Sequence, residues 1–206
     1  MGFFDSLFGS KKHTNVEVVP DHIWMTSFAK FAGLAKDVED RAQSGTVAIL
    51  LVAHFPDVLA RLEELANQLA LSVPVKAVPA GNLDVNLATS LNLDKSAIID
   101  VIVGERHPLP SVDDRLEEFA DELPCRCRFS HHISLEDPVF EIFAGPWVVN
   151  VLRKLGISED QAIESNMVSR RIRQAQQKIE GRAFGSSDAN SAAEWLEKNC
   201  PDLRSK

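Results

Sequence analysis

Residues 46–55, TVAILLVAHF, form a nearly continuous apolar run. Such a run is typical of a strand in a parallel sheet whose two faces are both covered by helices, because a strand with one wet face alternates apolar and polar residues. Pro56 and Asp57 follow directly, and apolar residues then recur at helical spacing, beginning with Leu59 and Leu62. This stretch therefore predicts one strand and one helix of an α/β domain.

Other strand and helix patterns lie on both sides of this unit. Before it, the sequence predicts a short strand and a helix that stops at Ser44 and Gly45. After it, the sequence predicts two strands, a helix and a last strand; in chain order the flanking ranges are 22–26, 28–38, 73–80, 98–103, 116–123 and 125–135. Strands that alternate with helices of about ten to fifteen residues predict a doubly wound parallel α/β sheet.

From residue 138 onward the patterns are all helical. Two short helices are expected between residues 139 and 155, with a break near Gly145 and Pro146, and longer helices at about 165–182 and 189–199. We therefore divide the chain into an N-terminal tail (1–18), an α/β domain (19–157) and a helical appendage (158–206).

The beginning of the chain has the pattern of a tail. Phe3, Phe4, Leu7 and Phe8 share one face if the segment is helical, with two lysines close behind. Such a segment can touch a membrane surface weakly, although a disordered tail, a dimer contact or a staple on the domain fits the same pattern. No apolar run approaches the ~20 residues of a membrane span, and no signal peptide is evident, so we expect a cytoplasmic protein.

The charge balance is acidic, with 22 Lys and Arg against 30 Asp and Glu and a net charge of -8. Phosphate binding relies on clustered Lys and Arg. The composition therefore argues against nucleic acid as a partner.

The chain has three cysteines, Cys125, Cys127 and Cys200. They indicate a reducing compartment, because their number is odd and their spacing is not that of a disulfide framework. Cys125 and Cys127 share one face of a predicted strand, and His131 and His132 follow closely. Zinc sites usually carry C-x-x-C rather than C-x-C. We therefore favour buried thiols that pack as small apolar groups, and we predict no metal site.

The chain lacks the motifs that such folds use to bind phosphates or to activate a nucleophile. It contains no G-x-x-x-x-G-K-[ST], no G-x-G-x-x-G after a strand and no G-x-S-x-G. Glu105, Arg106 and His107 do follow a predicted parallel strand, which is where ligands bind in open α/β sheets. Taken alone this is a weak signal, and the residues predict no assembled catalytic set.

The second half of the chain resembles a known family. The stretches SLEDPVFEIFAGPWVVNVLRKLG (134–156) and QAIESNMVSRRIRQAQQKIEGRAF (161–184) resemble consecutive segments of SecA, and Glu105-Arg106-His107 resembles its "TERHESRRID" stretch. Residues 102–185 can be laid on this pattern without a gap, and PDHIWMTSFAKF (20–31) resembles the start of the same domain. Between residues 46 and 101 the likeness is loose.

SecA is an ATPase that drives preproteins through a membrane channel, with its nucleotide between two RecA-like motor domains. The resemblance covers the second motor and the start of the scaffold helix. It implies a RecA-like parallel sheet of the P-loop NTPase fold, with helices on both faces, followed by a C-terminal helical appendage. It assigns residues 19–157 to the second motor domain.

The nucleotide-handling positions depart from the family pattern. In the gapless overlay, the arginines of the family's "QLRGRSGRQGD" fall on Glu117, Phe119 and Glu122, with Asp121 in the same altered stretch. A carboxylate close to a γ-phosphate repels it. The overlay therefore predicts a degenerate ATPase that is not an enzyme by itself and needs no cofactor; if a nucleotide binds at all, Arg106 and Arg115 are the cations available to it.

Two functions follow from the resemblance. The first is a non-catalytic binding or regulatory module in protein export, whose protein partner is a SecA, the translocation channel or another export component. The chain would then stay cytoplasmic or touch the inner membrane surface peripherally. The expected contact surface is the basic helix face of Arg170, Arg171, Arg173 and Lys178, although a merely solvated face fits these residues as well.

The second function is a half-site that completes an ATPase together with a separate phosphate-loop protein. It needs a cation aimed at the nucleotide, from Arg106 or Arg115. A helicase-like nucleic-acid binder uses the same kind of fold, but the acidic balance disfavours it.

Overall fold

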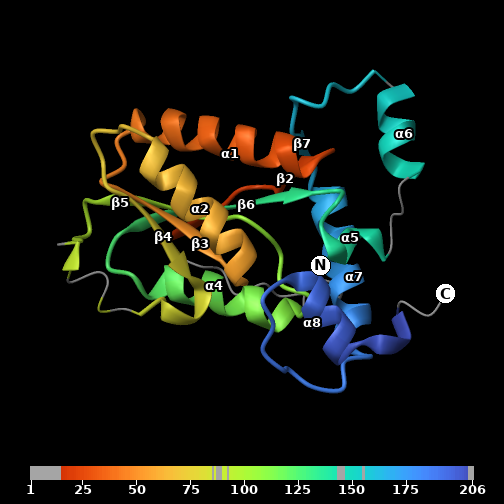
Figure 1. Ribbon diagram of the computed structural model, residues 1–206. Helices are drawn as coiled ribbons and strands as arrows, with labels where there is room; N and C mark the ends of the chain where they lie inside the picture. The colour runs from red at the N-terminus through yellow and green to blue at the C-terminus, as the bar shows by residue number, and fades with distance from the viewer. Residues whose placement is uncertain are drawn as a thin grey trace, which may run out of the picture.

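The computed structural model describes residues 15–84, 86, 90–91, 93–142, 147–154 and 156–203. Phe3, Phe4, Leu7 and Phe8 lie outside these residues, so the expected membrane contact stays a prediction. In chain order the elements are β1 (Val16–Val18), β2 (His22–Trp24), α1 (Ser27–Ala42), β3 (Ala48–Ala53), α2 (Pro56–Gln68), β4 (Val75–Pro79), η1 (Ala80–Asn82), β5 (Ile98–Val103), α4 (Pro110–Glu122), β6 (Arg126–Ser134), α5 (Pro138–Glu141), α6 (Trp147–Lys154), β7 (Ile163–Glu164), α7 (Asn166–Glu180), α8 (Ala192–Asn199) and η2 (Pro201–Leu203) (Figure 1).

The described part of the chain forms a seven-stranded sheet in the order β4-β3-β5-β6-β2-β7, with β1 also paired to β6. The strands from β4 to β2 pair in parallel, and β7 is antiparallel to β2. From β3 the chain passes through α2 to β4 on one side, and it then returns to β5 on the other side. The strand order therefore reverses between β3 and β5, which makes their carboxyl ends the topological switch point of the sheet.

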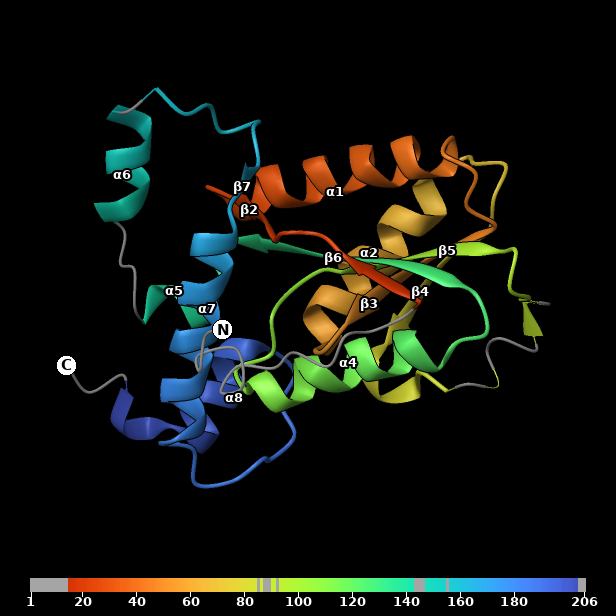
Figure 2. The same cartoon turned by 180° about the vertical axis from the view of Figure 1, so that it is seen from behind.

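Helices cover both faces of the sheet, as the apolar run at 46–55 predicts. All six residues of β3 are buried. On one face, Leu34 of α1 and Leu62 of α2 pack against β3. On the other face, Leu116 and Phe119 of α4 belong to a second apolar core with alternate residues of β3, β5 and β6. Figures 1 and 2 show α1 and α2 on the side of the sheet opposite α4. The expected α/β fold class is confirmed.

The helices α5, α7 and α8 gather at the end of the sheet where the parallel strands end, and α6 stands apart from them (Figure 1). Val139 of α5, Ile179 of α7 and Trp195 of α8 share one apolar cluster with Phe55, the residue that precedes α2. The appendage thus packs on the same edge that carries the switch point.

Two elements differ from the sequence-based expectation. The prediction that the chain is all helical after residue 138 is wrong, because β7 pairs Ile163 with Ile23 of β2. A two-residue strand is too short to show a period of two in the sequence. β1 lies at the end of the segment assigned to the tail, and it pairs Val16 with Cys127.

No helix in the described ranges is both long enough and apolar enough to cross a membrane.

Gly33 permits the close approach of α1 to Trp24. A Cβ at this position would lie 2.0 Å from Trp24 Cη2, within the indole ring. We expect Gly33→Ala to lower the free energy of unfolding by about 1–3 kcal/mol, because over-packing forces the indole and the helix apart. Urea unfolding measures the change. Gly181→Ala is the control, since its Cβ would meet nothing closer than 3.5 Å, and an equal effect of both substitutions would contradict the packing argument.

Candidate functional site

The loops that follow β3 and β5 meet at the switch point. His54 and Phe55 come from the first loop, and Gly104, Glu105 and Arg106 come from the second. The Gly104 amide donates to the Val52 carbonyl at 2.9 Å, which ties the second loop to the end of β3. In an open α/β sheet, this crevice is the position that receives a ligand.

The Glu105 side chain occupies the backbone amides of this crevice. Its Oε1 accepts hydrogen bonds from the His54 amide and the Phe55 amide, both at 3.0 Å. The residue is only 4% exposed, and burial raises the pKa of its carboxyl to about 8. These amides precede α2, where a phosphate-binding fold would offer them to an anion. Here a side chain of the same chain takes that place.

Asp113 at the start of α4 is the centre of a buried polar network. Its carboxylate accepts hydrogen bonds from the His107 amide (3.0 Å), from Arg106 Nη1 (3.2 Å) and from Gln176 Nε2 (2.7 Å), and His54 Nε2 lies 2.9 Å from it. Burial alone would raise the pKa of Asp113, but the His54 ring beside it and the charge of Arg106 hold it well below its usual range. Gln176 brings α7 into this network.

Arg106 is held between two carboxylates. Nη2 donates to Asp21 Oδ1 at 2.6 Å, and Nη1 donates to Asp113. Asp21 and Asp113 are both buried. Both arms of the guanidinium are therefore used within the fold, and charge-assisted bonds of this kind fix a side chain firmly.

The appendage closes the crevice from outside. The His107 ring stacks on Phe55 at 5.3 Å and meets the edge of Trp195 of α8 at 5.3 Å. The Asp57 amide donates to the Asn190 carbonyl, just before α8. A hollow of about 280 Å³ remains here, below the range of about 300–1,000 Å³ of typical ligand pockets.

The residues that the overlay places on the family's arginine motif lie on α4, and the crevice is lined by other residues. Phe119 is buried in the core, Glu117 and Asp121 are half-buried, and Glu122 is exposed. Arg115 lines a separate hollow of about 510 Å³ beside Glu118 and Glu122, whereas Arg106 lines the crevice. The structure thus does not bring the two candidate arginines into one hollow.

The four basic residues predicted as a contact surface divide into two groups. Arg173 donates to Asp114 Oδ2 at 2.5 Å and to the Pro110 carbonyl at 3.1 Å, and so joins α7 to α4. Arg170, Arg171 and Lys178 are exposed.

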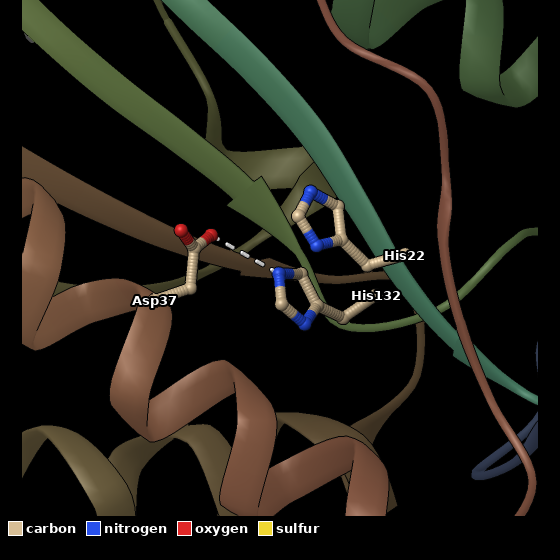
Figure 3. A group of neighbouring side chains, drawn as sticks. All are labelled: His22, Asp37 and His132. Carbon is tan, nitrogen blue, oxygen red and sulfur yellow. Dashed lines mark hydrogen bonds and ion pairs between the residues drawn. The ribbon is translucent and has the colours of Figure 1, made fainter. Parts of the chain in front are cut away.

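A second polar cluster, His22, Asp37 and His132, lies under α1 (Figure 3). These three side chains are close enough together to hold a metal ion. The sequence did not predict this cluster. Trp24 Nε1 donates to His132 Nδ1 at 3.3 Å, and His132 Nε2 lies 3.1 Å from Asp37 Oδ2. Because the indole can only donate, His132 carries its proton on Nε2 and donates it to Asp37. If a metal bound Nε2, the ring proton would move to Nδ1, where it would meet the indole N–H. We therefore interpret the cluster as a chain of hydrogen bonds from Trp24 through His132 to Asp37.

Among the described residues, the structure does not group Cys125 and Cys127 with other possible metal ligands. Cys125 and Cys127 are buried free thiols in the apolar core. Burial raises the pKa of both thiols, so the thiol form that packs as an apolar group is favoured.

The polar layer under α1 continues to the centre of the sheet. Asp100 in the middle of β5 is fully buried, and it pairs with Arg41 Nη1 and Arg128 Nη2, each at 2.6 Å. Arg41 also binds Asp37, with Nε 2.9 Å from each carboxylate oxygen. A buried charge network thus joins α1 to β5 and β6.

The buried imidazoles make stability depend on pH. Burial lowers the pKa of His107 and His131 to about 3 and that of His132 to about 4. Below pH ~6.5 the unfolded chain protonates these rings while the folded chain does not, so stability falls as the pH falls. Glu105 acts in the opposite sense, because the folded chain keeps its proton up to about pH 8.

Between pH ~6.5 and ~4.5, unfolding lets three imidazoles bind a proton each and makes one carboxyl release its proton. Unfolding therefore takes up about two protons in total. We expect the free energy of unfolding to fall by roughly 2–3 kcal/mol per pH unit in this window. Urea unfolding at several pH values measures the slope, and His132→Gln removes one of the imidazoles and lessens the slope. Stability that rises as the pH falls from 6.5 to 4.5 would contradict this balance.

The fold and the crevice define a class: a doubly wound α/β domain whose switch point is largely occupied by its own side chains. No protein-family model matches the chain. The chain is similar to the protein translocase subunit SecA of Psychrobacter sp. (strain PRwf-1), with 44% identity over 88 residues, which are 42% of this chain and 9% of that relative. It is likewise similar to SecA of Acinetobacter baylyi (43% over 88 residues, 42% and 10%) and to SecA 1 of Alkaliphilus metalliredigens (37% over 87 residues, 42% and 10%).

The chain therefore contains a SecA-like segment, and the resemblance stated from its motifs is confirmed. The chain spans about a tenth of the length of these relatives. The assignment of the nucleotide-motif arginines to Glu117, Phe119 and Glu122 rests on the overlay and stays a prediction.

Proposed function

We propose that the chain is a non-catalytic, SecA-like second motor domain that acts as a binding or regulatory module in protein export. The SecA-like segment supports the link to export. The observation that carries the non-catalytic part is the absence from the sequence of G-x-x-x-x-G-K-[ST] and of G-x-G-x-x-G after a strand. The Glu105 side chain on the amides of His54 and Phe55 is consistent with it.

Phosphoryl transfer needs backbone amides or cations that cradle the phosphates and a cation that meets the developing charge. The amides at the switch point already bind Glu105, and Arg106 is divided between Asp21 and Asp113. Phe55 stacks on His107, and Trp195 of α8 meets His107 in an edge contact, so the appendage packs on the same loops. These contacts favour a domain that is kept for its surface.

The partner that we propose is a protein: a SecA, the translocation channel or another export component. The proposed location is the cytoplasm, with peripheral contact at the inner membrane surface. The net charge of -8 supports a protein rather than nucleic acid as the partner.

Quantitative capture from a lysate of the chain's own cell tests the export role, with the full chain as bait and with or without ATP and Mg²⁺. Recovery of the full-length translocation ATPase or the channel is the expected result. Recovery of neither, with the bait folded, would overturn the role in export and leave a SecA-like scaffold with another use.

The half-site alternative makes a different prediction in the same system. If the chain completes an ATPase, the captured partner hydrolyses ATP faster with the chain, and Arg106→Ala or Arg115→Ala removes the stimulation. Because Arg106 also holds the fold together, Arg115→Ala is the cleaner variant: Arg115 is exposed, and its only described bond is a long contact (3.4 Å) from Nε to the Ser111 carbonyl.

A further inference from the structure

The outward face of α7 carries a continuous stripe of long side chains. Exposed residues recur at spacings of three and four, which places them on one side of the helix. The members of this stripe are Met167, Arg170, Arg171, Gln174, Gln177 and Lys178. Their span of eleven positions corresponds to about 17 Å of helix. We refer to these six residues as the α7 stripe.

The opposite side of α7 is fixed to the rest of the molecule. Ile172 and Ile179 are buried, and Gln176 donates to Asp113 and to the His107 carbonyl, each at 2.7 Å. Arg173 is tied to α4 through Asp114. Because these bonds set the rotation of the helix, the α7 stripe points away from the core. Figure 2 shows α7 standing beside the end of the sheet.

The α7 stripe is basic and carries no acid. Two arginines and a lysine lie on it, in a chain whose net charge is -8. Glu180 is the acidic residue of α7, and it accepts a hydrogen bond from Ser111 Oγ at 2.8 Å, beside α4. Glutamines and Met167, which is 71% exposed, complete the stripe. The forks of Arg170 and Arg171, among amides and an apolar tip, are few for a phosphate backbone, but they match a helix with spaced carboxylates.

We propose that the α7 stripe docks an acidic helix of a protein partner. This inference rests on the proposed function and names the chemistry of its partner surface. Arginine forks bind carboxylates in a bidentate manner, and methionine adapts to an apolar contact. The stripe is long enough to face about three turns of a partner helix.

The direct test uses the full chain and an alanine-based helical peptide of about 18 residues with glutamates along one face. Backbone amide NMR shifts are recorded at about 20 mM salt, where screening is weak. We expect saturable shifts that map to Met167, Arg170 and Arg171, and no shifts with the same peptide carrying glutamine for glutamate. Shifts elsewhere, or none, would overturn the proposal.

A matched pair of variants separates the stripe from general charge. Arg170→Glu with Arg171→Glu is expected to weaken peptide binding about tenfold or more, and Lys76→Glu with Arg126→Glu makes the same change of net charge at exposed positions off α7. If both double variants lost peptide affinity equally, the net charge of the chain would explain the binding, and the α7 stripe would be overturned as the binding site. Circular dichroism confirms that both variants fold.

Two further outcomes decide between partner classes. Tighter binding of a single-stranded oligonucleotide or of anionic vesicles than of the acidic peptide, lost in the α7 variant, would overturn a protein partner for this surface. Capture of an export component that is unaffected by Arg170→Glu with Arg171→Glu would end the docking proposal and leave the proposed function standing.

Discussion

Replacing Asp113 with alanine is expected to lower the free energy of unfolding by about 3–5 kcal/mol, because it removes one of the two carboxylates that pair with the buried Arg106 and leaves buried donors without an acceptor. Asp113 is fully buried, and its loss leaves Arg106 with Asp21 alone and deprives the His107 amide and Gln176 of their acceptor. Asp113→Asn keeps the shape but not the charge, and we expect it to cost about 1.5–3 kcal/mol. Urea unfolding followed by tryptophan fluorescence measures both changes.

Asp114 supplies the control, since it is the next residue of the same helix. Its ion pair with Arg173 is partly exposed, at 46% and 38% of the two side chains, and such pairs contribute about 0–1 kcal/mol. An Asp113→Ala variant that is no less stable than Asp114→Ala would contradict the network at the switch point.

Asp100→Ala is expected to lower the free energy of unfolding by about 3 kcal/mol or more, because it breaks two buried ion pairs at once. The loss leaves Arg128 without its described acidic partner, while Arg41 keeps Asp37. We expect α1 to loosen first, because Arg41 ties it to the sheet. Hydrogen exchange of the α1 amides, together with urea unfolding, reports this directly.

Replacing Asp100 and Arg128 together with leucine distinguishes charge from packing. A buried pair can often be exchanged for apolar residues without a large loss of stability, so the double variant should recover part of what Asp100→Ala loses. Asp40→Ala on the exposed side of α1 should change stability by less than about 0.5 kcal/mol. If Asp40→Ala lowered the free energy of unfolding as much as Asp100→Ala, the loss at Asp100 could not be assigned to its buried ion pairs.

The regular part of the fold could be predicted because its signals are local. β5 begins and ends where the apolar run IIDVIV predicts, at Ile98–Val103, and α2 begins at Pro56. Continuous apolar strands require cover on both faces, which implies the layered arrangement. β7 was missed because its two residues form a strand only by pairing with the edge of β2.

The site was harder to predict because its partners are distant in the chain. Arg106 was recognised as a residue at a strand end, but its bond to Asp21 spans 85 positions. Gln176 reaches the His107 carbonyl across 69 positions, and no periodicity in the sequence signals such a contact. One local signal was overlooked: a single aspartate inside the apolar run of β5 indicates a buried ion pair, since an isolated charge is costly there.

The sequence also could not show which of the four basic residues predicted as a contact surface are exposed. Arg170, Arg171, Arg173 and Lys178 look alike in the sequence, but Arg173 binds Asp114 while Arg170 and Arg171 point to solvent. The distinction depends on how α7 is rotated, which Ile172 and Gln176 set through the core.

The most direct measurement of the central claim is equilibrium binding of ATP with Mg²⁺ to the purified chain by calorimetry, together with a sensitive assay for phosphate release. We expect no saturable binding up to millimolar ATP and no hydrolysis above the blank, because the sequence has no phosphate-binding motif. In addition, Glu105 binds the amides of the crevice, and Arg106 is bound by Asp21 and Asp113. Saturable ATP binding, or phosphate release that tracks the chain through purification, would contradict it.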